Sequence, residues 1–266
     1  MRSFIGSSFA SAVFAALAAD ATAHSSALDA AGIERLAALR QAPELAGALV
    51  YRGSVFARRS PGAAPLFTYE RRVARIGDGL TSAHITRDTN GDVIITEQAE
   101  FNAAYALQRF DAINAQLGYS GSVGVSNGGR HLEYRLIQDG RITTASEDVA
   151  DPVVTGPSLH GLILHQWDAL AAGKTIRVRM IVMTKRETYG FEIRRQSQAN
   201  GRTSFSITPS SLIVRMLVAP LTVTFDSATR NVVRYEGRVP PMQLVNGKLE
   251  ALDARVEYTM NVAVYR

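Results

Sequence analysis

The sequence predicts a mainly β protein of the α+β class, with one large curved antiparallel sheet or half-open barrel and two or three short helices. Apolar and polar side chains alternate in short runs from about Leu49 to the C-terminus, which is the spacing of strands with one buried face. Hairpin-type turns separate several of these runs. A parallel sheet covered on both faces would instead give continuous apolar runs.

The N-terminus has the layout of a secretory signal peptide. Arg2 precedes an apolar stretch of about 16 residues, which is shorter than the roughly 20 that a spanning helix needs. Ala21, Thr22 and Ala23 fit the small-residue pattern of a cleavage site. We therefore expect residues 1–23 to be a signal peptide that is removed near Ala23, with an uncleaved anchor as the alternative, and we expect the mature chain to be periplasmic or secreted.

Residues 24–44 are expected to form a leader that is either helical or mobile. The segment is rich in alanine, and Leu28, Leu36 and Leu39, or alternatively Ile33, recur at roughly helical spacing until Pro43. The period then changes to two. Residues 45–266 are accordingly predicted to form a single antiparallel β domain.

The expected strands follow from this alternation. The earlier runs are residues 50–57, 66–73, 80–86, 93–97 and 131–137. Asn90 and Gly91 between the third and fourth runs suit a tight hairpin turn. A second hairpin is predicted from residues 221–225 and 232–236, and the clearest alternation places Val256, Tyr258, Met260, Val262 and Val264 on one face of a long C-terminal strand.

Two helices are expected to interrupt the strands. The first begins after Pro157, with Ser158 as its cap, and ends at Gly173. The second runs from Pro209 to Val218, with Thr208 as its cap, Pro209 at its first position and Pro220 as its stop. This second helix is apolar on nearly every side, so it must be enclosed by protein or lie against something apolar that is not protein.

The segment from Phe101 to Leu117 allows two interpretations. Leu107, Phe110, Ile113 and Leu117 are spaced as on one face of a helix, whereas Gly118 and the glycine- and serine-rich stretch after it fit a broken strand equally well. The sequence leaves this choice open.

Composition excludes several classes of site. The chain has no cysteine, so a disulfide framework, a thiolate metal site and a cysteine nucleophile are excluded. The net charge of +5 suits anionic partners, but the basic residues are interleaved with acids and form no nucleic-acid motif. We expect no nucleic-acid binding, and peripheral contact with an anionic membrane surface remains an open hypothesis.

Residues 124–128 match the G-x-S-x-G pattern, which in α/β-hydrolases places a serine between a strand and a helix. Here a further alternating run begins at His131, so the required helix is absent from the pattern. His131, His160 and His165 are the candidate bases for Ser126, and no acid is evident from the sequence. A glycine-rich loop between two strands is the preferred interpretation, and a hydrolase using Ser126 is the weakest hypothesis.

No metal site, cofactor or catalytic residue is predicted. His160 and His165 are five residues apart rather than four, which does not place them on one helical face, and His165 and Asp168 are expected to make a surface hydrogen bond. Residues 88–92 supply oxygen ligands but lack the glycine and the acidic residue of a calcium loop, so a hairpin turn is expected there. We therefore predict that the protein is not an enzyme.

The C-terminal half resembles an uncharacterised family of exported bacterial β-rich proteins of unknown function. The likeness is carried by Gln166-Trp167-Asp168-Ala169-Leu170-Ala171-Ala172-Gly173-Lys174, by Tyr189-Gly190-Phe191-Glu192-Ile193-Arg194-Arg195, and by shorter stretches at 209–211, 215–220 and 234–237. Residues 65–70 agree more faintly. The resemblance implies no functional residue, and the expected architecture is also similar to the lipoprotein-carrier half-barrels of the bacterial periplasm.

The favoured function is the binding or carrying of an apolar ligand such as a lipid on the concave face of the sheet. Burial of each methylene contributes roughly 0.8 kcal/mol, so such a site needs no polar motif. The predicted ligand-binding residues are large apolar side chains: Trp167, Met180, Phe191, Leu212, Met216 and Phe225. The alternative is a structural or protein-interaction module of the cell envelope without a ligand, which a filled interior would favour.

Overall fold

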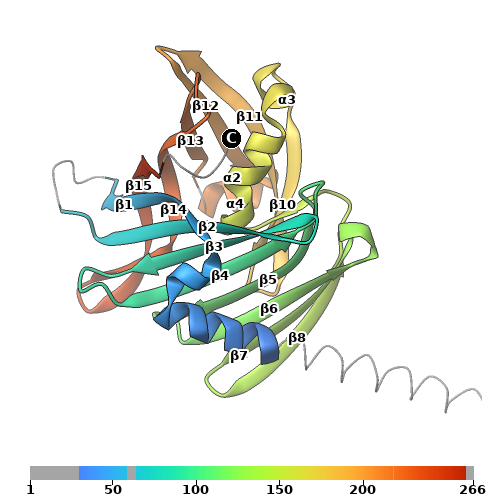
Figure 1. Ribbon diagram of the computed structural model, residues 1–266, viewed down its shortest axis with the longest axis vertical. Coiled ribbons are helices and arrows are strands. Elements are labelled where there is room, and N and C mark those ends of the chain that lie inside the picture. Colours follow the sequence, from blue (N-terminus) through green and yellow to red (C-terminus); the bar gives the residue numbers. More distant parts are fainter. Residues whose placement is uncertain (1–29, 59–63, 218, 262–266) are drawn as a thin grey trace, which may run out of the picture.

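The computed structural model describes residues 30–58, 64–217 and 219–261 (Figure 1). The predicted signal peptide, residues 24–29 of the predicted leader and Val218 lie outside the described residues, as do Val262 and Val264 of the predicted C-terminal strand.

The described strands form one 15-stranded sheet, which confirms the predicted mainly β fold class. The order is β8-β7-β6-β5-β4-β3-β2-β1-β15-β14-β13-β12-β11-β10-β9, so β8 and β9 stand at its two ends and the sheet is not closed into a barrel. The strands are β1 (Ala48–Ala57), β2 (Phe67–Ile76), β3 (Gly79–Arg87), β4 (Val93–Phe101), β5 (Leu107–Asn114), β6 (Tyr119–Ser126), β7 (His131–Gln138), β8 (Arg141–Asp148), β9 (Val153–Val154), β10 (Ile176–Val182), β11 (Glu187–Ala199), β12 (Arg202–Pro209), β13 (Leu221–Asp226), β14 (Val232–Val245) and β15 (Lys248–Met260).

Nearly all neighbours in the sheet are also neighbours in the sequence. The exception is the antiparallel pair of β1 and β15, which joins the N-terminal strands to the C-terminal strands with Tyr51 opposite Met260 and Ala57 opposite Ala254. The short β9 pairs with β10 in parallel, and the remaining pairs are antiparallel. The sheet is therefore mixed only at one edge.

The hairpin predicted at residues 88–92 is confirmed. It connects the antiparallel strands β3 and β4, and the Asp88 carboxylate accepts hydrogen bonds from the backbone N–H groups of Asn90 and Asp92. Residues 101–117, which the sequence left open, contain the end of β4 and the whole of β5. Phe110 and Ala112 of β5 face a buried apolar cluster.

The first predicted helix was wrong in its extent and its cap. Two helices, α2 (Gly156–His165) and α3 (Trp167–Ala171), replace it, and Gln166 separates them. The cap is Thr155 rather than Ser158. Ser158 is the third helical residue, and its hydroxyl accepts a hydrogen bond from the Thr155 backbone N–H, which satisfies a donor at the start of the helix.

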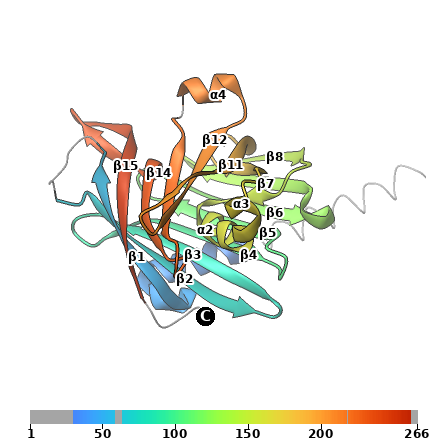
Figure 2. The same ribbon diagram turned by 90° about the horizontal axis from the view of Figure 1, so that it is seen from above.

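The second predicted helix was wrong in its first turn. Pro209 is the last residue of β12 and lies opposite Phe191, and the Ser210 N–H donates to the Gly190 carbonyl. The residues predicted to begin the helix therefore pair with strand β11 instead. The helix α4 is Leu212–Leu217 and stands away from the rest of the molecule (Figure 2). Two short 3₁₀ turns, η1 (Pro43–Ala46) and η2 (Asn127–Gly129), complete the described elements.

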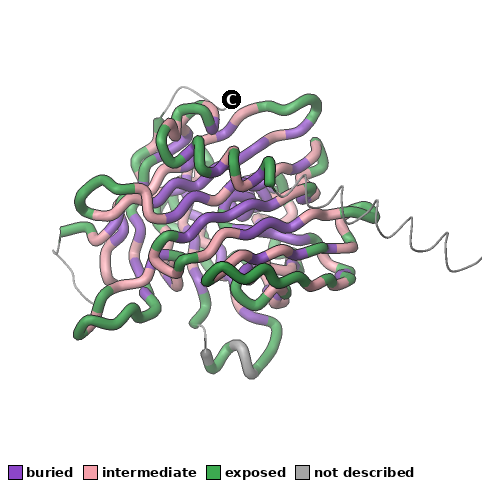
Figure 3. Tube along the Cα trace, turned by 90° about the horizontal axis from the view of Figure 1, so that it is seen from below, coloured by how far each residue is buried: buried purple, intermediate pink, exposed green. Residues whose placement is uncertain are grey.

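The two faces of the curved sheet are covered by different helices. Residues 30–41 are helical and cross the outer face (Figure 1), where Leu36 and Leu39 pack against Ala83 of β3 and Ile113 of β5. The helices α2 and α3 lie within the curve, between the N-terminal and C-terminal strands (Figure 2). Buried residues follow the middle of the strands, while the turns are exposed (Figure 3).

Candidate functional site

A cavity of about 420 Å³ lies on the concave face of the sheet, beneath α2. This volume falls in the range of about 300–1,000 Å³ that is typical of small-molecule sites. Its walls come from both halves of the sheet and from the helix. The apolar wall residues include Val55, Phe110, Leu159, Ile163, Met180, Ile181, Phe191, Leu221, Val223, Val232 and Val256.

Strand alternation accounts for the apolar walls. Val223 and Leu221 are two residues apart on β13, and Val256 and Tyr258 are two residues apart on β15, so each pair points to the same face of the sheet. Leu159 and Ile163 are four residues apart on α2, which directs both toward that face. The cavity therefore lies between two elements that present apolar side chains to each other.

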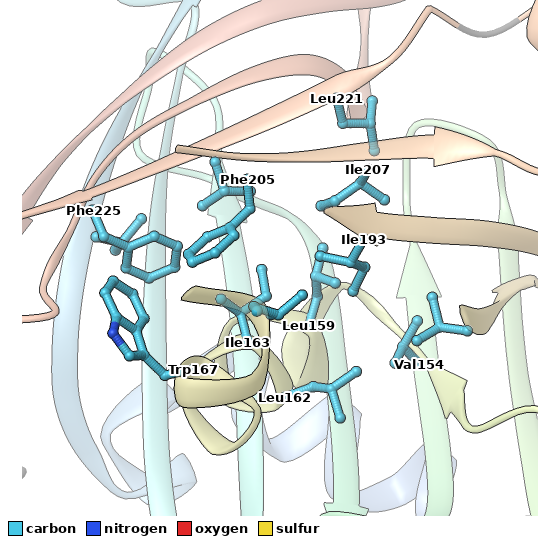
Figure 4. Close-up of a cluster of buried hydrophobic side chains, with 14 of the residues drawn as sticks. Val154, Leu159, Leu162, Ile163, Trp167, Ile193, Phe205, Ile207, Leu221 and Phe225 are labelled. Carbon is cyan, nitrogen blue, oxygen red and sulfur yellow. The ribbon is translucent and has the colours of Figure 1, made fainter. Parts of the chain in front are cut away.

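A packed aromatic cluster lies beside the cavity. Trp167 contacts Phe205 and Phe225 edge to face, with ring centroids 5.3 and 5.4 Å away (Figure 4). The guanidinium of Arg230 lies 5.2 Å from the centroid of the Trp167 ring, on the solvent side. This cluster anchors the end of α2 and the start of α3 on the C-terminal strands.

The six residues predicted to bind a ligand have three different locations. Met180 and Phe191 line the cavity. Trp167 and Phe225 are buried in the apolar cluster next to it and are not among the lining residues. Leu212 and Met216 lie on α4, where 74% and 78% of their surface is exposed, and they do not line the cavity either.

Polar side chains from four adjacent strands form one row on the concave face. Tyr51 of β1 is opposite Arg71 of β2, Arg71 is opposite His84 of β3, and His84 is opposite Glu97 of β4. Residues opposite each other in a sheet share a face. We call Tyr51, Arg71, His84 and Glu97 the polar row.

Hydroxyl groups of neighbouring tyrosines connect the polar row. The Tyr69 hydroxyl oxygen lies 3.4 Å from the Tyr51 hydroxyl oxygen and 3.3 Å from each of the two ring nitrogens of His84. Tyr258 of β15 adds a ring 4.7 Å from Tyr51, centroid to centroid. These rings make the β1–β2–β15 part of the cavity wall both aromatic and polar.

The helix α2 places His160 and Gly156 over the polar row. The His160 ring is edge to face with Tyr51 at 5.4 Å and stacks on Phe225 at 5.7 Å. Gly156 approaches the row so closely that a Cβ there would lie 3.2 Å from Glu97 Oε2 and 3.6 Å from His84 Nδ1. A glycine at the start of α2 therefore lets the helix sit directly on the sheet.

Burial sets the protonation states in this region. It raises the pKa of Glu97 to about 7, because the cavity offers the carboxylate little solvent. It lowers the pKa of His84 and His160 well below the usual value, and the positive charge of Arg71 lowers both further. Burial also raises the pKa of Tyr51, Tyr69 and Tyr258, so near neutral pH the histidines and tyrosines are uncharged.

Ser126 lies on the outer face rather than at the cavity. As predicted, the residues after it form a turn into the next strand, and the register places Ser126 opposite His131. His131 Nδ1 lies 2.8 Å from an Asp148 carboxylate oxygen, while its Nε2 faces Glu133 at 3.8 Å. A serine, a histidine and an acid are thus adjacent across three strands, but the nitrogen that would activate Ser126 faces a carboxylate instead.

The histidines and the aspartate of the metal hypothesis do not converge on one point in the described part of the chain. His160 of α2 packs against Tyr51, His165 stacks on Tyr105 at 5.4 Å, and Asp168 pairs with Arg230 at 3.0 Å. Among the described residues, no group of three or more histidine, aspartate or glutamate side chains could hold an ion.

In the part of the chain that the structure describes, no helix has both the length and the apolar character to cross a membrane.

The polar row was missed at the level of sequence. Each member lies within two residues of a buried apolar position on the same strand, so each reads locally as an ordinary polar strand residue. The signal that could have found the row is the alternation of inward and outward positions along a strand. Arg71 is two residues before Val73, so both point to the same face of β2, and both are buried. A charged residue at an inward position is unusual and would have marked the site.

The comparisons with known proteins find distant structural similarity. No protein-family model matches the sequence, and a search of curated proteins finds no relative. A solved structure from Bacteroides fragilis, of a protein proposed to be exported and with a YmcC-like fold, is similar at 9% identity and a TM-score of 0.25. The match covers 80% of this chain and 94% of that one, and at this level of similarity it carries no functional argument.

Proposed function

We propose that the protein is exported and binds or carries an apolar or amphipathic small molecule, such as a lipid, in the cavity on the concave face. The observation that carries this proposal is a cavity of ligand size whose walls are mainly apolar and include a few polar groups, among them Tyr51, His84 and Glu97 of the polar row. Export is inferred from the signal-like residues 1–23.

The energetics of burial support an acyl chain as the bound part. At roughly 0.8 kcal/mol per methylene, a chain of ~12 methylenes would contribute about 10 kcal/mol before the entropic costs of association. Such binding needs no catalytic group. Accordingly, we propose a carrier or binding protein rather than an enzyme, and the polar row is assigned to ligand recognition.

A filled interior would have favoured the alternative, a structural or protein-interaction module of the envelope. The cavity weighs against this alternative because protein cores are normally packed to the density of organic crystals, with few voids larger than a water molecule. A partly open space of about 420 Å³ reduces the contacts between the sheet and the helix that covers it. Retaining this space is easier to explain if a ligand occupies it.

The test is mass spectrometry of organic extracts from the protein purified from the periplasm. We expect a lipid or other amphipathic molecule in stoichiometric amount. The variant Met180→Trp places a larger side chain on the cavity wall and should reduce the bound amount severalfold, because the added ring occupies the space of the ligand. The matched control Met216→Trp makes the same exchange on exposed α4 and should bind normally.

Two results would contradict the proposal. One is repeated absence of any extracted molecule together with failure of the purified protein to bind long-chain probes. The other is equal ligand content in Met180→Trp and Met216→Trp, because that would place the ligand elsewhere. Circular dichroism of both variants establishes that they are folded before the comparison is made.

A further inference from the structure

Arg71 carries a buried positive charge without a counter-ion in the described part of the chain. Only 4% of its surface is exposed, and no described carboxylate forms an ion pair with it. Its Nε atom is buried and has no hydrogen-bond partner there. A buried charge is normally paired and hydrogen-bonded, because removing an ion from water is costly. A missing negative partner is therefore the simplest physical explanation for Arg71.

His160 presents a second unsatisfied group at the same place. Its side chain is 8% exposed and lines the cavity, and neither ring nitrogen has a hydrogen-bond partner among the described residues. Arg71 lies opposite both Tyr51 and His84 in the sheet, and the His160 ring contacts Tyr51, so these groups share one region. A neutral imidazole can donate one N–H, which makes His160 a donor for an incoming acceptor.

The charges around Arg71 determine the ligand charge that fits. The facing groups are Tyr51, Tyr69, His84, Glu97 and His160, together with Tyr258 of β15. The tyrosines and histidines are neutral near pH 6, and Glu97 is then mostly protonated because burial raises its pKa to about 7. One uncompensated positive charge remains, so a single negative charge complements the site.

We propose, building on the proposed function, that the ligand is a long-chain carboxylic acid whose carboxylate lies at the Arg71 side of the polar row, with His160 as a further donor. A guanidinium and a carboxylate match in shape as well as in charge, since two parallel N–H···O bonds can form. The acyl chain would lie along the apolar wall formed by Leu159, Ile163 and Phe191. A dianionic phosphate head would instead bring two negative charges to a site that offers one positive charge, and the second would be buried without a partner.

The experiment compares three probes that share one chain: dodecanoate, dodecan-1-ol and dodecyl phosphate, titrated calorimetrically into delipidated protein at pH 6. Dodecanoate is expected to bind at least about tenfold more tightly than the alcohol, which is the scale of a charged hydrogen bond. Arg71→Met should abolish this preference, because it should weaken the binding of dodecanoate at least about tenfold more than the binding of the alcohol. Arg72→Met is the matched control, because Arg72 is adjacent but pairs with Glu70.

A second variant keeps the test decisive if Arg71→Met folds poorly. His160→Phe preserves an aromatic ring against Tyr51 and Phe225 but removes both nitrogens, and it should also reduce the preference for dodecanoate over the alcohol. Each variant is first compared with the parent protein by circular dichroism and thermal unfolding.

The outcomes separate this inference from the proposed function. Equal binding of dodecanoate and dodecan-1-ol by the parent protein overturns the carboxylate assignment and leaves a neutral-lipid carrier standing. Tighter binding of dodecyl phosphate than of dodecanoate also overturns it, in favour of a phosphate head group. Binding of none of the three probes overturns both proposals.

Discussion

Glu97 is a single carboxyl group on the cavity wall, and its raised pKa makes the stability of the protein depend on pH. Below pH 4.5, its ordinary pKa, the group is protonated in both the folded and the unfolded states. Between pH 4.5 and about 7, the unfolded state ionises while the folded state keeps its proton, so the free energy of unfolding falls as pH rises. A shift of this size corresponds to about 3 kcal/mol.

Glu97→Gln is therefore expected to gain stability relative to the parent protein as pH rises from 5 to 8, by up to about 3 kcal/mol. The measurement is urea unfolding of both proteins at each pH. Taking the difference between them cancels the opposite contribution of His84 and His160, whose lowered pKa values cost stability below about pH 6.5. Glu133→Gln, at an exposed position, is the control. A pH-independent difference between Glu97→Gln and the parent protein would refute the raised pKa.

Ser126 provides a residue-scale test of the expectation that the protein is not an enzyme. The Nε2 atom of the adjacent His131 faces Glu133 rather than the serine, so we expect Ser126→Ala to leave any esterase activity unchanged. The measurement is the hydrolysis of a p-nitrophenyl ester by the parent protein and the variant. A loss of activity of at least about 100-fold, the scale of a lost general base or nucleophile, would restore the hydrolase hypothesis.

Among the elements, the helical residues 30–41 act as a cover for the outer face. Leu36 is completely buried against Ala83 and Ile113, and Arg35 pairs with the buried Asp111 at 2.7 Å. Leu36→Ala is expected to lower the free energy of unfolding by about 2–5 kcal/mol, because it leaves a cavity between helix and sheet. Chemical denaturation measures this loss.

Arg40→Ala on the same helical segment is the matched control, because residue 40 is exposed. It should change stability by less than about 0.5 kcal/mol. If Leu36→Ala were equally mild, the helix would contribute little to the native state.

The helix α4 contrasts with this cover, since Leu212 and Met216 are largely exposed. The double variant Leu212→Ser and Met216→Ser is expected to leave the free energy of unfolding within about 0.5 kcal/mol of the parent value and the affinity for dodecanoate unchanged. Val223→Ala, on the cavity wall, is the comparison and should weaken both properties. Loss of affinity in the α4 variant would show that this helix belongs to the ligand site after all.

At the scale of the whole molecule, the continuous sheet predicts cooperative unfolding. The pairing of β1 with β15 joins the two halves, and one core cluster contains Val50, Tyr51 and Val73 together with Phe205 and Phe225 of the other half. Neither half can then expose its apolar face without exposing that of the other. Trp167 fluorescence, which reports on the C-terminal half, and far-UV circular dichroism should give coincident urea transitions. Two separate midpoints would show that the halves unfold independently.

Local pattern was sufficient for the elements whose neighbours are close in sequence. The alternation in residues 256–260 predicted the inward face of β15, and Asn90-Gly91 predicted the hairpin between β3 and β4. Those features depend on side-chain periodicity and on backbone angles, which a short segment carries by itself. The α2 cap at Thr155 and the start of α4 were predicted wrongly because ladder and capping hydrogen bonds competed for the same residues.

The amino-acid sequence by itself thus determined an antiparallel sheet with alternating apolar and polar positions, together with the positions of several turns. Only the tertiary structure decided that Tyr51, Arg71, His84 and Glu97 stand in one row and that α2 lies over them. Strand register and the pairing of β1 with β15 are set by contacts between segments far apart in the chain. Backbone hydrogen bonds are chemically the same at every residue, so no short stretch of sequence specifies which of its polar side chains will meet.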